Sequence, residues 1–137
     1  MIQARVLNAA EAQGPVLVLD EPLSFWGAFE PRTGMIIDVH HPQCGRCVAG
    51  TILLMRESKG SGSAPGAIAE AIRLGTAPAA ILLVMPDINL AIGADVAATL
   101  YGSHCAILSV TEGELAELSR ATRLHITAAG EITFETV

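Results

Sequence analysis

The sequence predicts a single α/β domain of layered type, with a mixed sheet that ends in a C-terminal hairpin. Short branched and aliphatic runs alternate with helical runs through the middle of the chain. Two further short runs flank Ala128-Ala129-Gly130, a typical hairpin turn. No repeat, linker or long charged run divides the 137 residues, so we expect one domain over 1–137.

Eight segments have the character of strands. Each is short, rich in branched or aliphatic residues, and bounded by Gly, Pro or polar clusters. The expected strands cover residues 2–6, 16–19, 35–38, 50–55, 80–85, 106–110, 125–127 and 131–134.

The first of three expected helices covers residues 66–74. Ile68, Ala71 and Ile72 lie on one face at helical spacing, and Gly75 supplies a C-terminal stop. The second is Ala-rich and covers 91–101.

The third expected helix begins at Thr111. The Thr111 hydroxyl can cap the helix while Glu114 reaches back, which is the spacing of a capping box. Together with the strands, the three helices favour the layered α/β class.

The composition narrows the choice of partners. Hydrophobic residues make up 51% of the chain and charged residues only 16%. This excess indicates either an obligate partner interface or a core rich in small Ala residues. The net charge is −6 and the Lys and Arg residues are scattered, so we expect neither nucleic acid nor an anionic membrane as partner. The longest apolar run, 77–85, is too short to span a bilayer.

The expected location is the cytoplasm. Three cysteines, an odd number, suit a reducing compartment. No continuous apolar stretch follows Arg5, so we expect no signal peptide.

A loop rich in Gly and Ser, residues 58–66, separates an apolar run from the first helix. A helix N-terminus offers unpaired N–H groups and a positive dipole end. Such a loop can hold a carboxylate or phosphate, or stabilise a Ser alkoxide. The alternative is a flexible surface loop, since Gly/Ser clusters often have no other role.

Further motifs occur in order around this loop. They are Leu23-Ser24-Phe25-Trp26-Gly27, Pro31-Arg32-Thr33-Gly34-Met35-Ile36-Ile37-Asp38, His41-Pro42, Val48-Ala49-Gly50 and Gly75-Thr76-Ala77-Pro78-Ala79-Ala80-Ile81. Read with the loop, they resemble the small subunit or swivel domain of the aconitase X family. The resemblance extends from about residue 23 to residue 110.

The resemblance implies a β/β/α swivel fold and a role in a hydro-lyase. A larger subunit or domain would carry the iron–sulfur cluster or metal, with no cofactor in this chain. The implied substrate is a small hydroxylated carboxylate, most plausibly cis-3-hydroxy-L-proline, which would give Δ1-pyrroline-2-carboxylate. A phosphomevalonate dehydratase small subunit is the alternative within the class. A non-catalytic binding or assembly module that retains the swivel fold is the alternative outside it.

The resemblance also implies site residues. The family's Gly-Ser step aligns with Gly60-Ser61, which makes Ser61 the expected catalytic base. Ser63 competes, because Gly62 replaces a residue that is usually Ser. Lys59 stands where the family usually has Arg. A Lys ammonium supplies a point charge, whereas an Arg guanidinium can bind a carboxylate through two parallel N–H groups. Substrate contacts are assigned to Ser24, Trp26, Lys59, Gly60, Gly62 and Ser63.

Two features of the sequence leave alternatives open. Trp26 can line a pocket, anchor an interface or pack in the core. His40, His41, Cys44 and Cys47 lie within eight residues and could hold zinc or iron, or support redox chemistry. Adjacent His side chains in an extended segment point to opposite faces, however, and the family lacks these cysteines. We therefore expect no metal here.

Overall fold

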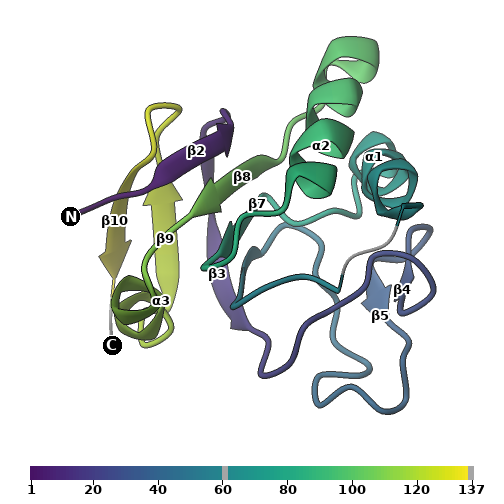
Figure 1. The fold of residues 1–137 in the computed structure, drawn as a ribbon, viewed down its shortest axis with the longest axis horizontal. Coiled ribbons are helices and arrows are strands. Elements are labelled where there is room, and N and C mark those ends of the chain that lie inside the picture. Colours follow the sequence, from purple (N-terminus) through teal and green to yellow (C-terminus); the bar gives the residue numbers. More distant parts are fainter. Residues whose placement is uncertain (60–61, 136–137) are drawn as a thin grey trace.

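The computed structural model describes residues 1–59 and 62–135 and forms three layers. In Figure 1, β9 and β10 lie to the left, β8, β7 and β3 in the middle, and α1 and α2 to the right. The elements are β1 (Ile2–Gln3), β2 (Arg5–Asn8), β3 (Ala12–Val18), β4 (Phe29–Glu30), β5 (Met35–Ile36), β6 (Ile52–Met55), α1 (Ala64–Leu74), β7 (Ala80–Leu83), α2 (Ile88–Tyr101), β8 (Ala106–Ser109), α3 (Glu112–Leu118), β9 (Arg123–Ile126) and β10 (Glu131–Glu135).

The middle layer is built on four parallel strands in the order β3-β6-β7-β8. Both faces of this sheet are covered, which explains why its strands are nearly continuous apolar runs. In β6, Leu53 and Met55 pack toward α1 and α2, while Ile52 and Leu54 pack toward the other sheet. Both helices are crossovers between parallel strands and lie on the same face, as crossovers of one hand require.

The outer sheet shares strand β3 with the middle one. Residues 12–15 of β3 pair antiparallel with β9, and residues 16–18 pair parallel with β6. Pro15, which has no N–H, lies where β3 changes partner. At the other corner, β1 pairs with β10 and β2 pairs with β8. The two sheets therefore pack face to face, and the β/β/α arrangement is confirmed.

Several predicted boundaries differ from the structure. The first predicted strand is split into β1 and β2, because the chain crosses between two sheets there. Strand β3 begins four residues before the predicted start, at Ala12, and the two-residue β4 was not predicted. Helix α1 begins at Ala64, with Pro65 in the first turn where proline is favoured. Helix α2 begins at Ile88, because Asp87 caps it.

Close packing of α1 against α2 orients the start of α1. A Cβ atom added at Gly93 of α2 would lie 2.3 Å from Ile68 Cγ2 and 2.6 Å from the Pro65 carbonyl oxygen. Only glycine permits this approach, so Gly93 lets the first turn of α1 lie directly against α2. The loop before α1 thus leads into a tightly packed helix end.

Candidate functional site

The carboxyl ends of the parallel strands bring three loops together. In open α/β sheets, ligands bind in the crevice at this edge. The loops follow β3, β6 and β7, and hydrogen bonds join them. The Arg56 carbonyl after β6 accepts the N–H groups of Val84 and Met85 after β7, at 3.0 and 2.9 Å. The Lys59 N–H donates to the Leu23 carbonyl after β3, at 3.1 Å.

The loop between β6 and α1 holds the predicted base. Gly60 and Ser61 lie outside the described residues. Lys59, Gly62 and Ser63 are all exposed at the carboxyl edge. Ser63 is the N-cap residue of α1, and its carbonyl accepts the Ala67 N–H at 3.2 Å. The structure therefore places the described part of this loop at the sheet edge, while the roles of its residues stay predictions.

Arg56, the other cation of this loop, is directed elsewhere. Its guanidinium pairs with Glu112 Oε1 of α3 at 3.1 Å, and both side chains are exposed. An exposed pair of this kind contributes little to stability. Lys59 is thus the cation of the loop that remains a candidate for substrate binding.

A contact between Ser58 and Asp87 was not foreseen from the sequence. The Ser58 hydroxyl donates to Asp87 Oδ2. Asp87 Oδ1 accepts the Asn89 N–H at 2.8 Å and so caps α2. The cap role of Asp87 could be read from its place before an apolar helix. The partner of Ser58 could not, because 29 positions separate the two residues.

Ser24 and Trp26 lie in the loop after β3. The Ser24 hydroxyl donates to the Trp26 carbonyl at 2.8 Å and accepts its N–H at 3.2 Å, which closes a tight turn. Trp26 is 62% exposed, so it is not a core residue. It borders a groove of about 500 Å³ whose other lining residues are Phe25, Gly27, Phe29, Glu30, Pro31, Ile37, Gly66, Ala67 and Glu70.

Both carboxylates of this groove are paired with arginines. A hydrogen bond from Arg32 holds the pKa of Glu30 below its usual value, and a hydrogen bond from Arg73 does the same for Glu70. A general base works best with a pKa near the operating pH. Neither carboxylate therefore suits that role, which leaves the groove as an apolar surface with ionised rims.

Comparison with known proteins identifies the family. The profile of the aconitase X swivel domain matches residues 1–134. The chain belongs to the aconitase X swivel-domain family. The resemblance inferred from the ordered motifs is thus confirmed.

Two relatives of this swivel domain are dehydratases by name. A cis-3-hydroxy-L-proline dehydratase of Pseudomonas aeruginosa is 42% identical over 112 residues, which cover 82% of this chain and 19% of the relative. A phosphomevalonate dehydratase small subunit of Methanothermobacter thermautotrophicus is 41% identical over 93 residues, which cover 68% of this chain and 71% of that subunit. The swivel domain thus spans about a fifth of the first relative's length.

The fold has a solved counterpart. The crystal structure of Thermococcus kodakaraensis aconitase X, in its holo-form, matches the swivel domain with a TM-score of 0.80 and 25% identity. The match covers 96% of this chain and 95% of that chain. In the described part of the swivel domain, no helix is both long enough and apolar enough to cross a bilayer.

The histidines and cysteines of residues 40–47 do not form a metal-ligand group in the described part of the swivel domain. His41 is buried, its Nδ1 accepts the Gln43 N–H at 3.0 Å, and its Nε2 lies 3.0 Å from the Glu21 carbonyl oxygen. Because Nδ1 is an acceptor, Nε2 carries the proton and donates to Glu21. His41 therefore organises the loop. Across residues 1–59 and 62–135, no three His, Cys, Asp or Glu side chains group as metal ligands.

We expect Cys44 and Cys47, both exposed, to be dispensable for catalysis. Changing both to Ser should cost less than about tenfold in activity, or roughly 1.4 kcal/mol in the barrier. Steady-state kinetics of the assembled complex and metal analysis of the isolated swivel domain check this. Stoichiometric zinc or iron that is lost together with activity in the double variant would contradict it. Cys105 should stay unreactive toward alkylating reagents in both proteins, because burial raises the pKa of its thiol to about 12.

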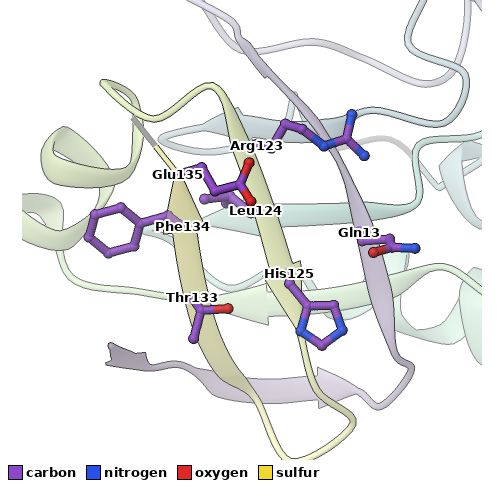
Figure 2. A pocket seen from close by; sticks show the side chains of 7 residues that line it. All are labelled: Gln13, Arg123, Leu124, His125, Thr133, Phe134 and Glu135. Atoms are coloured by element: carbon purple, nitrogen blue, oxygen red, sulfur yellow. The ribbon is translucent and has the colours of Figure 1, made fainter. Parts of the chain in front are cut away.

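A second hollow, of about 310 Å³, lies on the outer face of the outer sheet. Figure 2 shows Gln13, His125 and Thr133 side by side on β3, β9 and β10, as their pairing register requires. Their neighbours Leu124 and Ile126 point into the core. This alternation is typical of a solvated antiparallel sheet face. None of the residues that line the hollow belongs to the loop after β6.

Proposed function

We propose that this swivel domain is the smaller part of an aconitase X-type dehydratase, active only with a larger subunit or domain. Support comes from the family match over residues 1–134 and from two dehydratases about two-fifths identical to it. The observation that carries the proposal is the position of the Gly/Ser loop. It joins β6 to α1 at the carboxyl edge of the parallel sheet, where α/β folds bind ligands.

In this proposal Ser61 is the catalytic base. It removes the proton α to the substrate carboxylate, and hydroxide leaves from the adjacent carbon, so that the net change is loss of water. A Ser hydroxyl is a weak base unless its alkoxide is stabilised. Helix α1 begins three residues after Ser61, and backbone N–H groups at a helix N-terminus provide such stabilisation. The charge of Lys59 would assist and would also attract the substrate carboxylate.

The substrate we favour is cis-3-hydroxy-L-proline. Loss of water from it gives an enamine that tautomerises to Δ1-pyrroline-2-carboxylate. Phosphomevalonate is the second candidate. The small subunit of an archaeal phosphomevalonate dehydratase is 41% identical to this swivel domain over 93 residues, which cover 71% of that subunit. A phosphate ester usually requires several cations, preferably Arg. Arg56 is paired with Glu112, which leaves Lys59 as the cation of this loop and favours the amino acid.

The larger partner would supply the iron–sulfur cluster or metal. The described residues of the swivel domain hold no group of three side chains that suits such a centre. We therefore assign no step of the reaction to a cluster in this chain.

Co-expression of the swivel domain with its large subunit tests the proposal. The purified complex should release Δ1-pyrroline-2-carboxylate from cis-3-hydroxy-L-proline and turn over phosphomevalonate much more slowly. The opposite preference would assign the second substrate. A stable complex that is inactive on both would favour the non-catalytic binding module instead.

A further inference from the structure

The start of the Gly/Ser loop is held by the loop after β7. The Ser58 hydroxyl donates to Asp87 Oδ2, and both residues are half-buried. The two residues follow neighbouring parallel strands, β6 and β7, so the contact bridges adjacent loops at the carboxyl edge. Ser58 begins the Gly/Ser loop that was read with the family motifs, but no role was assigned to it, and Asp87 lies outside those motifs.

Asp87 is itself held in place. Its Oδ1 accepts the Asn89 N–H at 2.8 Å, and it is the N-cap of the 14-residue helix α2. Just before it, the Val84 and Met85 N–H groups bind the Arg56 carbonyl. A carboxylate with two occupied oxygens at a helix end is a well-ordered acceptor. Asp87 therefore provides the Ser58 hydroxyl with an acceptor whose position is held by α2.

The next residue of the loop is held from the other side. The Lys59 N–H donates at 3.1 Å to the carbonyl of Leu23, whose side chain is fully buried. Side-chain and main-chain bonds from two different loops thus hold Ser58 and Lys59. These are the last described residues before Ser61, which lies two positions after Lys59.

We infer that Ser58 and Asp87 form a positioning pair that sets the direction in which the chain enters the catalytic loop. The inference rests on the proposed function, in which Ser61 is the base. A base displaced by about 1 Å can lose on the order of a hundredfold in rate, so a loop rich in glycine needs such anchors. Neither Ser58 nor Asp87 touches the substrate in this scheme.

The variants are chosen to separate positioning from folding. Ser58→Ala removes the hydroxyl and leaves the α2 cap intact. Asp87→Ser retains a good cap residue but is too short to reach Ser58. Each should lower the kcat of the assembled complex about tenfold to a hundredfold, with KM changed less than about threefold. The double variant should lose little more than either single one, because both break the same contact.

Ser58→Thr is the matched control, because it retains the hydroxyl and should recover most of kcat. Recovery would not occur if Ser58 mattered only through its small size. A kcat of Ser58→Ala within twofold of the parent would overturn the inference. Additive losses in the double variant would do so as well.

Amide hydrogen exchange supplies a readout that does not depend on activity. In the full chain, Ser58→Ala and Asp87→Ser should speed exchange in the peptide spanning 56–66 and leave β7 and β8 unchanged. Unchanged exchange in that peptide would overturn the positioning pair. If the parent complex is inactive on both substrates while exchange responds as expected, the proposed function fails and the anchoring contact stands.

Discussion

Ser61→Ala is expected to lower kcat of the assembled dehydratase by about a hundredfold to ten-thousandfold, the usual range for a positioned general base. The substitution removes the proton acceptor and keeps the backbone that leads into α1. KM should change little, because carboxylate contacts would come from N–H groups, Lys59 and the partner. Steady-state kinetics of the complex on cis-3-hydroxy-L-proline measure both quantities.

Ser63→Ala is the control for this prediction. Ser63 is exposed and is the N-cap residue of α1. Its substitution by Ala should therefore lower kcat by about tenfold at most. If Ser63→Ala is instead the inactive variant and Ser61→Ala retains near-normal kcat, the base is Ser63. The alignment of the Gly-Ser step would then be wrong by two residues.

The second large effect is dependence on the partner. The isolated swivel domain should be folded and inactive, because the proposed function assigns the iron–sulfur cluster or metal to the larger subunit. Trp26 is 62% exposed and borders the apolar groove beside the carboxyl edge of the parallel sheet. If the partner completes the catalytic centre at this edge, Trp26 lies on the side that faces the partner. Trp residues that become buried in a protein–protein interface commonly contribute a large share of the binding free energy. We expect Trp26→Ala to raise Kd for the large subunit at least tenfold, as measured by calorimetry.

Tyr101→Ala is the matched control for Trp26. Tyr101 is an aromatic residue that is 47% exposed, but it ends α2, and α2 begins at the carboxyl edge. Fourteen helical residues place the two ends of α2 about 20 Å apart. Its substitution should leave Kd within about threefold. Equal effects of the two substitutions, or dehydratase turnover by the isolated chain, would contradict this account.

The features that the sequence determined alone depend on residues a few positions apart. Gly75 and Gly102 end α1 and α2 with φ of 77° and 67°, a left-handed conformation that glycine adopts without strain. Thr111 and Glu114 form the predicted capping box around the start of α3, with bonds of 3.2 and 2.9 Å. The hairpin of β9 and β10 closes at the predicted turn. In each case the residue type restricts the local backbone, whatever packs against it.

The tertiary structure decided everything that depends on distant partners. Within its seven residues, β3 changes its pairing partner from β9 to β6, because it takes part in both sheets. No local sequence pattern predicts this change of partner. The motifs located Trp26, but only the packing of its loop left it exposed. In the sequence, nothing distinguishes Ser58 from the other serines of its loop. The parallel pairing of β6 with β7 places Asp87 within hydrogen-bond distance of Ser58. Strand pairing in a sheet joins residues far apart in the chain, so these contacts follow from the assembled fold rather than from local propensity.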